Sequence, residues 1–396
     1  MRGLPTPPFA KHPPTDDNAR VSATILFAGG GSGGHLYPGV SVAEVLTRMM
    51  PGLRPLFLCT KREIDSTILK STPFEFIQQP IVPPRKSVGG LINFWRGWRS
   101  TQDLVRSIIK ERAPAAVLGL GGYAAGVTVK LAGKAKIPAA ILNPDVIPGK
   151  ANQFLFNSVQ KVCCQFEATA KFVSEQHQSK LIVTGCPIRS DIASRPNRTK
   201  ASMELGLDPS LHTLVVTGAS QGAVTVNQAI LETLTRIHAS GRSLQGWQVL
   251  HLAGKDNADE VKAEYRELEM PAVVLDFTPA MSDVWAVADL AVARAGASTC
   301  AELAVCGVPS VLMPYPFHKD QHQLANAKVL ADAGASVVVS DERDRKKSGD
   351  ALTPIIEGLL YDVPQRKAMS DAAFTLAKPD AAERVANVLR EMMAGQ

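Results

Sequence analysis

A short apolar run that leads into a cluster of glycines constrains this sequence more than any other feature. Thr24–Ala28 reads as a buried parallel strand, and Gly29–His35 follows it directly. Pro38 stands where we expect the first turn of a helix, which we place at about Gly39–Met50. Glycine permits a sharp turn and a close approach of the backbone to a ligand. Because free N–H groups at a helix start attract anions, the pattern predicts an anion-binding turn.

The same glycines match a dinucleotide-binding pattern, although that pattern is weak alone. Gly29, Gly31 and Gly34 have the spacing G-x-G-x-x-G. In a dehydrogenase an acidic residue that binds the ribose should end the next strand. Here that strand, Pro55–Cys59, is followed by basic residues, of which Arg62 could suit a phosphorylated ribose. The missing acid argues against a nicotinamide-dependent enzyme.

The strand, glycine turn and helix recur in the second half of the chain. Thr213–Thr217 enters Gly218–Ala223, and a helix is expected at about Val224–Ser240. A third glycine-marked turn, Arg294–Thr299, follows the expected strand Leu290–Ala293, and Ser298 or Thr299 can cap its helix. We therefore predict an α/β protein with two Rossmann-like domains that face each other across a cleft.

Alternation of short apolar runs with helical patterns supports a parallel sheet in each half. The further expected strands are Phe74–Gln78, Ala115–Gly119, Ala139–Asn143, Lys161–Gln165, Leu181–Thr184, Gln248–Leu252, Ala272–Leu275 and Ser310–Met313. The expected parts are a disordered proline-rich extension (1–20), an N-terminal domain (21–187), a linker (188–200), a C-terminal domain (201–378) and a C-terminal helix (379–396). That helix could pack on either domain.

Charge and composition limit the classes of ligand that we expect the protein to bind. The 396 residues are 45% hydrophobic and 20% charged, with a formal charge of +6. This mild basic excess suits anionic ligands or an anionic membrane and is too diffuse for nucleic acid. Six cysteines without a CxxC pair fit reduced thiols in a cytoplasm. We expect no membrane span, no signal peptide and no metal site.

One segment, Pro83–Arg112, has two readings. Leu91, Trp95 and Trp98 recur at helical spacing. Aromatic side chains among basic ones are typical of a helix that rests on anionic lipid, and equally of an ordinary helix whose aromatics are core. The basic residues near the start of this segment are Arg85, Lys86, Arg96 and Arg99.

Six motifs occur in an order that carries a family resemblance. They are Gly29–Leu46, Leu118–Gly126, Gly185–Arg189, Gly218–Ala223, Arg294–Leu303 and His318–Ala327. Together they closely resemble the MurG family, the peripheral-membrane N-acetylglucosaminyltransferases of peptidoglycan synthesis. The resemblance implies a GT-B fold and metal-independent, inverting transfer of N-acetylglucosamine from UDP-N-acetylglucosamine (UDP-GlcNAc). The acceptor would be undecaprenyl-diphosphate-linked N-acetylmuramoyl-pentapeptide (lipid I), at the cytoplasmic face of the membrane. Anionic lipid and other cell-wall synthesis proteins are candidate partners.

The resemblance also implies roles for single residues. His35 is a candidate base, and Gly121, Gly122 and Tyr123 form an acceptor-side loop. Donor-side positions are Ser32, Gly33, Gly34, Asp145, Arg189, Ser220, Thr278, Ala297, Ser298, Thr299, Glu302 and Gln323. The chain departs from the family at Asp145, where relatives have an asparagine, so that contact is in question.

Other interpretations remain open at this stage. His35 could be a hydrogen-bonding anchor of its loop, and Glu302 a first-turn acid that favours the helix dipole. The protein could be another UDP-sugar enzyme on the same scaffold, such as a glycolipid galactosyltransferase or a UDP-GlcNAc epimerase. It could also be a non-catalytic protein that binds nucleotide sugars.

Overall fold

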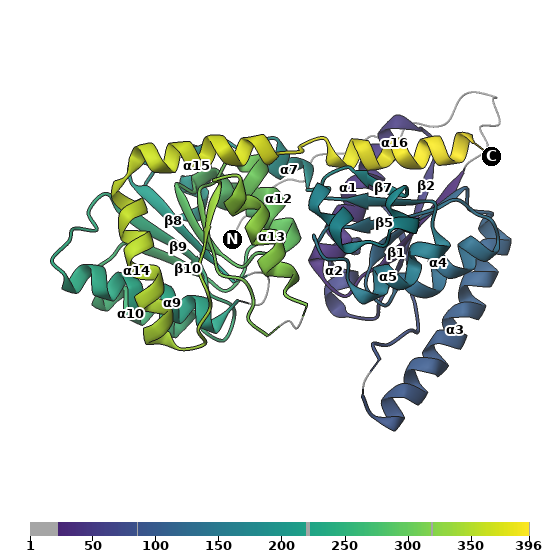
Figure 1. Cartoon of the computed structure of the whole chain (residues 1–396), viewed down its shortest axis with the longest axis horizontal. Coiled ribbons are helices and arrows are strands. Elements are labelled where there is room, and N and C mark those ends of the chain that lie inside the picture. Colours follow the sequence, from purple (N-terminus) through teal and green to yellow (C-terminus); the bar gives the residue numbers. More distant parts are fainter. Residues whose placement is uncertain (1–22, 85, 219–221, 318–319, 396) are drawn as a thin grey trace, which may run out of the picture.

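The structure, a computed structural model, describes residues 23–84, 86–218, 222–317 and 320–395. These residues form two separate β-sheets in which every strand pair is parallel (Figure 1). The first sheet has the strand order β3-β2-β1-β4-β5-β6-β7, and the second has the order β10-β9-β8-β11-β12-β13. We call the parts built on them the N-terminal lobe and the C-terminal lobe. The α/β prediction is confirmed.

The N-terminal lobe alternates strands with helices. Its strands are β1 (Thr24–Gly29), β2 (Arg54–Cys59), β3 (Glu75–Gln78), β4 (Ala116–Gly121), β5 (Ala139–Asn143), β6 (Lys161–Cys164) and β7 (Leu181–Val183). Its helices are α1 (Gly33–Met49), α2 (Glu63–Lys70), α3 (Val88–Arg112), α4 (Ala125–Lys134), α5 (Lys150–Leu155) and α6 (Glu175–Gln178), with 3-10 turns at Phe156–Ser158 and Glu167–Phe172.

The C-terminal lobe repeats this plan. Its strands are β8 (His212–Thr217), β9 (Trp247–Leu252), β10 (Ala272–Leu275), β11 (Leu290–Ala293), β12 (Ser310–Leu312) and β13 (Ser336–Val338). The helices from the first crossing onward are α7 (Ser190–Ala193), α8 (Arg198–Leu205), α9 (Val224–Ala239), α10 (Ala258–Glu267), α11 (Met281–Val287), α12 (Ala297–Cys306), α13 (His322–Asp332), α14 (Arg345–Tyr361), α15 (Val363–Leu376) and α16 (Ala381–Ala394).

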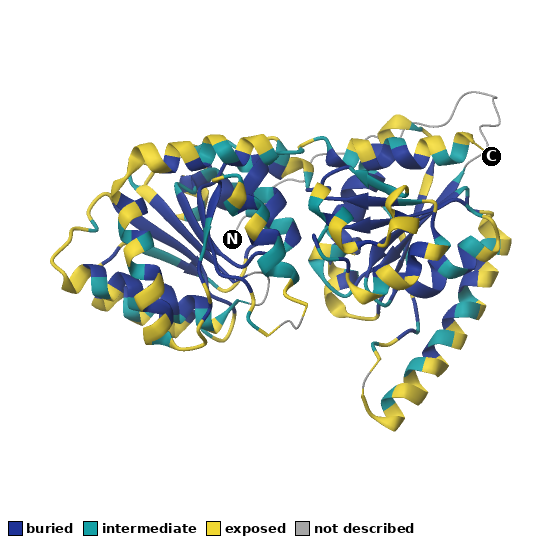
Figure 2. Cartoon of the chain, viewed as in Figure 1, coloured by how far each residue is buried: buried dark blue, intermediate teal, exposed yellow. Residues whose placement is uncertain are grey.

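The central strands of each sheet are buried on both faces, as Figure 2 shows for both lobes. In β1, Ile25 and Phe27 belong to one core cluster and Leu26 to another, because successive side chains point to opposite faces. Strands buried on both sides need apolar residues at every position. This explains why the strands were visible in the sequence as uninterrupted apolar runs.

Two predicted helix starts are wrong. Helix α1 begins at Gly33, not near Gly39, so Pro38 lies inside it and not in its first turn. A proline at that position removes only the hydrogen bond to the Gly34 carbonyl, close to an end where bonds are already missing. Helix α12 begins after Gly296, and neither Ser298 nor Thr299 caps it, because both lie within its first turn.

The chain passes twice between the lobes. After β7 it enters α7 and α8, which pack against α11 of the C-terminal lobe, so part of the expected linker is helical. After α15 it returns as α16, which packs on α1 (Figure 1). Val385 and Leu389 of α16 are fully buried in the core of the N-terminal lobe. The C-terminal helix therefore ties the end of the chain to its beginning.

Helix α3 projects from the N-terminal lobe (Figure 1). Ser87 caps its start by accepting a hydrogen bond from the Gly90 N–H. Its first turns are exposed: Val88 is 78% exposed, Trp95 58% and Leu91 49%. Trp98, one turn further, is only partly exposed and lies edge-on to Phe154, with ring centroids 6.4 Å apart.

Candidate functional site

The glycine turns lie at the point in each sheet where the strand order reverses. In the N-terminal lobe β1 is followed in space by β4, so the turn after β1 and the loop Gly121–Tyr123 after β4 are neighbours. The turn that begins at Arg294 lies at the matching point between β8 and β11. Open parallel sheets bind ligands in the crevice at such points. Both candidate half-sites therefore occupy the positions that topology favours.

His35 lies between the two N-terminal turns. Its Nδ1 is 3.2 Å from the Gly30 carbonyl oxygen and 3.1 Å from Ser32 Oγ. A Cβ added to Gly121 or Gly122 would come within 3.4 Å of the ring, so glycine leaves room for it. Because a carbonyl only accepts, Nδ1 carries the proton and Nε2 keeps a free lone pair. Burial lowers the pKa of His35 below its usual value, which keeps the ring neutral.

A carboxylate of the chain itself fills part of the first turn. Asp65 is fully buried on α2, and its two oxygens accept from the Gly31 N–H at 2.7 and 2.9 Å. It also accepts from the backbone and side chain of Thr60. Arg62 donates to the Gly31 carbonyl at 2.8 Å. The prediction of a free anion cradle is therefore wrong for Gly31, whose N–H already binds an anion.

The start of α12 faces the start of α1. A Cβ added to Gly34 would lie 3.6 Å from Ser298 Oγ, so the two helix starts meet across the lobes. Within the residues described, no acceptor binds the first-turn N–H groups of Ala297, Ser298 and Thr299. These N–H groups and the helix dipole are suited to an anion. The two helix starts thus lie against each other and differ in electrostatic character.

Glu302 lies one turn further along α12 and is held by an indole. Trp285 Nε1 donates to Glu302 Oε2 at 2.7 Å. Burial raises the pKa of Glu302 to about 7, against a smaller lowering by this hydrogen bond and by Arg189. A carboxylate poised near neutrality, with one oxygen fixed, is typical of functional sites.

Arg189 lies in the segment that first crosses between the lobes, and its side chain contacts both lobes. Its Nη1 donates to the Pro279 carbonyl at 2.7 Å, next to Thr278. Its guanidinium lies over the ring of Tyr37 on α1, 5.3 Å from the centroid. Nη2 is buried without a hydrogen-bond partner in the described chain. A buried guanidinium nitrogen with no partner indicates room for an acceptor that a ligand could supply.

A buried ion pair supports the loop that carries Gln323. Arg294 donates to Asp341 Oδ2 at 2.7 Å and to the carbonyl of Pro314 at 3.1 Å. The next residue, Tyr315, donates its N–H to Gln323 Oε1 at 2.9 Å. The side chain of Gln323 is thereby fixed at the start of α13. Removing either member of such a buried pair would leave an uncompensated charge.

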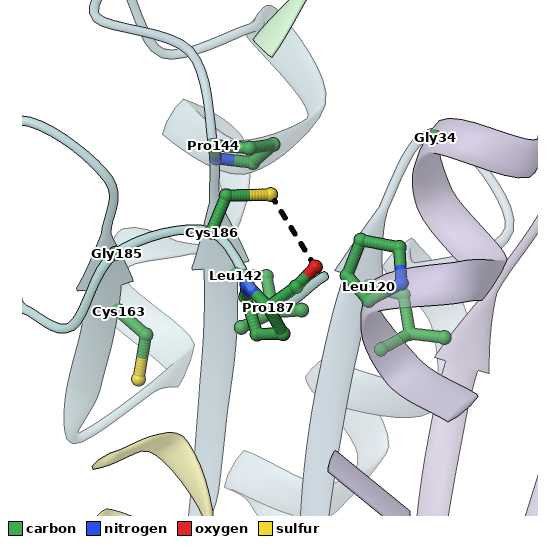
Figure 3. A pocket seen from close by; sticks show the side chains of 9 residues that line it. Gly34, Leu120, Leu142, Pro144, Cys163, Gly185, Cys186 and Pro187 are labelled. Carbon is green, nitrogen blue, oxygen red and sulfur yellow. Dashed lines mark hydrogen bonds between the residues drawn. The ribbon is translucent and has the colours of Figure 1, made fainter. Parts of the chain in front are cut away.

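Asp145 contacts the opposite lobe. Its carboxylate accepts from Asn326 Nδ2 of α13 at 2.7 Å. Figure 3 shows a small space between Gly34, Leu120 and Pro187, which is also lined by Pro144, the residue before Asp145. Its volume of about 10 Å³ is close to the least that one water needs. A larger cavity of about 280 Å³ lies between the lobes behind Cys186.

Two predicted site residues, Ser220 and Arg85, lie outside the described residues. The remaining members of the expected membrane segment are placed. Lys86 and Arg99 are exposed together with Leu91 and Trp95. Among the placed residues, no three His, Cys, Asp or Glu side chains are grouped to hold a metal ion. No helix in the same set could span a bilayer.

Comparison with known proteins decides the family. Residues 25–164 match the glycosyltransferase family 28 N-terminal domain, and residues 213–385 match its C-terminal domain. A protein of Geobacter metallireducens named UDP-N-acetylglucosamine–N-acetylmuramyl-(pentapeptide) pyrophosphoryl-undecaprenol N-acetylglucosamine transferase is 34% identical over 94% of this chain and 98% of its own. The protein of that name from Geobacter sulfurreducens is 35% identical over 93% and 98%. The chain belongs to this family of N-acetylglucosamine transferases.

A solved structure agrees with this assignment at the level of fold. The crystal structure of Acinetobacter baumannii MurG has a TM-score of 0.71 and 24% identity, over 93% of this chain and 99% of that one. The two lobes therefore form the GT-B arrangement of the N-acetylglucosamine transferase family. The predicted family and fold are confirmed.

The sequence analysis missed three residues that shape the site. Asp65, Trp285 and Asn326 contact predicted site residues but belong to none of the glycine motifs. Asp65 had a faint signal, since it is one of two acids in the first turn of α2. Trp285 had none, because its partner Glu302 is distant in the sequence. Asn326 lies in the motif His318–Ala327, which gave no sign of its partners on the other lobe.

Proposed function

We propose that this protein transfers N-acetylglucosamine from UDP-GlcNAc to the 4-hydroxyl of the N-acetylmuramoyl sugar of lipid I, with inversion. The single observation that carries the proposal is the approach of α1 to α12 at Gly34 and Ser298. It sets a neutral histidine beside the start of α1. Opposite lies the start of α12, whose first N–H groups have no acceptor among the described residues. The named relatives transfer the same sugar to the same class of acceptor.

His35 is suited to accept the acceptor's proton. Its Nδ1–H is fixed by the Gly30 carbonyl, so the free lone pair on Nε2 can face the attacking hydroxyl. As the oxygen–carbon bond forms, the proton moves to Nε2 and the bond to the diphosphate breaks on the opposite face. A positioned base of this kind contributes about 10²–10⁴-fold to the rate.

The leaving diphosphate gains charge as the sugar departs. Helix dipoles at the starts of α9 and α12 would stabilise that charge, because their N–H groups are already oriented. In this assignment Ser220 and Ala297–Thr299 lie beside the phosphates. Arg189 and Glu302 hold the nucleoside, with Glu302 on the ribose and Thr278 near the uracil ring. Gln323 contacts the sugar hydroxyls, and Gly121, Gly122 and Tyr123 contact the acceptor.

The exposed side of α3 would bring the enzyme to its lipid-linked acceptor. We define the α3 patch as Val88, Leu91, Ile92 and Trp95, all exposed. Lys86 and Arg99 add positive charge near it. An amphipathic helix that combines apolar and basic side chains binds the surface of anionic membranes. The protein would thus act at the cytoplasmic face as a peripheral enzyme.

The decisive experiment incubates the protein with labelled UDP-GlcNAc and a soluble lipid I analogue. We expect a product heavier by one N-acetylglucosamine residue, with a β-glycosidic bond, and stoichiometric UDP. Omitting the acceptor should abolish sugar consumption. Conversion of UDP-GlcNAc to its epimer without an acceptor would indicate the epimerase alternative, and binding without turnover would indicate a non-catalytic protein.

A further inference from the structure

One buried asparagine joins the two lobes. Asn326 lies on α13 of the C-terminal lobe and is fully buried. Its Oδ1 accepts from the Val146 N–H at 2.9 Å, and its Nδ2 donates to Asp145 at 2.7 Å. The same Nδ2 donates to the Ala295 carbonyl at 3.1 Å. The first two partners belong to the loop after β5 of the N-terminal lobe, and the third precedes α12.

The packing of the lobes makes these bonds necessary. Val146 is almost completely buried in a cluster made largely of C-terminal lobe side chains. Its backbone N–H is thereby removed from water and needs an acceptor. Asn326 supplies that acceptor. A residue of matching shape without a carboxamide would leave Val146, Asp145 and Ala295 each short of a partner.

The contact lies next to both halves of the candidate site, the start of α12 and the loop beside His35. Ala295 precedes Gly296, which caps the start of α12, so the hydrogen bond to its carbonyl helps to fix the turn that leads into the helix. Asp145 is close enough to His35 for its charge to raise the pKa of the ring, against the larger effect of burial. Asn326 therefore connects the helix start on the donor side to the loop beside the candidate base.

Packing around the contact is incomplete. Val329 and Leu330, one turn further along α13, line the 280 Å³ cavity between the lobes. Cys186 at the first crossing and Lys378 at the second also line it. Because apolar contacts do not fill this region, directional hydrogen bonds fix how the lobes align there.

From these contacts we infer that Asn326 is a positioning residue for the transfer reaction. It fixes how the two lobes align at the site and thereby orients the bound sugar. The inference rests on the proposed function. It assigns Asn326 no contact with either substrate. Its loss should therefore slow transfer much more than it weakens nucleotide binding, since the nucleotide contacts lie within the C-terminal side of the cleft.

The test compares turnover with nucleotide affinity in Asn326→Leu, which keeps the size of the side chain and removes its hydrogen bonds. We expect kcat to fall about tenfold or more, as the loss of two or three buried hydrogen bonds implies. The Kd of UDP, measured by calorimetry, should change less than about threefold, since a nucleotide held on one lobe does not use the contact. The rate at which UDP-GlcNAc is hydrolysed to UDP without an acceptor should rise relative to the rate of transfer.

Two further variants separate positioning from simple destabilisation. Asp145→Asn keeps an oxygen that can accept from Asn326, so it should retain a clearly higher kcat than Asp145→Ala. Leu359→Ala opens a cavity in the core far from the cleft, and should lower the melting temperature while leaving kcat unchanged at 25 °C.

The outcomes are distinguishable. Normal kcat in Asn326→Leu would overturn the inference, as would parallel losses of kcat and UDP affinity. Equal activity of Asp145→Asn and Asp145→Ala would also contradict it. Absence of transfer by the unmodified protein would instead contradict the proposed function, and this is measured before any variant is made.

Discussion

The turns after β1 and β11 share one plan and differ in what binds their N–H groups. In the N-terminal turn, Gly31 donates to the buried carboxylate of Asp65. In the C-terminal turn, the N–H groups of Ala297–Thr299 have no acceptor among the described residues. A carboxylate therefore already binds the Gly31 N–H at the first turn, whereas no described carboxylate binds the first N–H groups of α12.

Under the proposed function, this difference favours binding of the two reaction partners at different lobes. A carboxylate beside the first turn disfavours the leaving diphosphate there, and leaves a neutral imidazole to face a hydroxyl. Under the same proposal, the helix dipole at the second turn would stabilise the departing diphosphate. The same motif would then serve two purposes, depending on whether a carboxylate packs against the turn.

Removing the imidazole from the first turn should have the largest effect. In both His35→Ala and His35→Asn we expect kcat to fall about 10²–10⁴-fold at saturating donor. The asparagine variant can still donate to the Gly30 carbonyl but cannot accept a proton. Recovery of activity in His35→Asn would show that the ring only anchors the turn.

The pH dependence tests the same residue. Burial lowers the pKa of His35 below 6.5, so the neutral ring should dominate above that pH. The kcat of the parent should therefore be flat above pH 6.5 and fall only at lower pH, as the ring gains a proton. A profile that rises up to pH 8 would contradict a neutral His35 as the base.

Removing the internal carboxylate should have the next largest effect. Asp65→Asn places an amide N–H against donors on Gly31 or Thr60, and we expect the free energy of unfolding to fall by about 3 kcal/mol. Urea unfolding measures this. The matched control is Glu63→Gln, an exposed acid on the same helix, which should change stability by less than about 0.5 kcal/mol. Equal effects would mean that Asp65 does not hold the turn.

How much of the fold and of the candidate site could be predicted depends on how far apart in the sequence the contacting residues lie. The strands and switch points were predictable, because apolar runs and glycine turns are local signals. The start of α1 was not, since Gly33, Gly34 and Pro38 individually disfavour a helix. β13 was missed, although β7 and β12 are equally short and were predicted. Asn326 lies in a recognised motif, yet its role appears only when α13 meets the loop after β5.

The role of the second turn can be tested through the hydrogen bond from Trp285 to Glu302. Trp285→Phe removes the donor to Glu302 and keeps an aromatic ring. We expect the KM for UDP-GlcNAc to rise about tenfold with little change in kcat, as the loss of one hydrogen bond to a carboxylate implies. Unchanged KM would mean that Glu302 does not depend on this contact.

The pH profile of that KM gives an independent check. Glu302 has a pKa of about 7, and its carboxylate form would accept from the ribose. Donor affinity should therefore weaken as the pH falls below about 7. The hydrogen bond from Trp285 lowers this pKa, so in Trp285→Phe the midpoint should move to higher pH. A KM independent of pH would exclude Glu302 as a ribose ligand.

The smallest effect on transfer should come from the α3 patch, which lies on the N-terminal lobe alone. Leu91→Ser with Trp95→Ser should reduce binding to anionic vesicles by about 10–100-fold, since two large apolar side chains no longer enter the membrane surface. Transfer to a soluble acceptor analogue should change less than twofold, which is the control. Unchanged vesicle binding would place the membrane contact elsewhere.

The contrast between the turns is tested most directly by a crystal structure with UDP-GlcNAc bound. We predict that the diphosphate accepts hydrogen bonds at the starts of α9 and α12, with the anomeric carbon turned toward Gly34 and His35. A diphosphate bound at Gly31–Gly34, against the carboxylate of Asp65, would contradict the account.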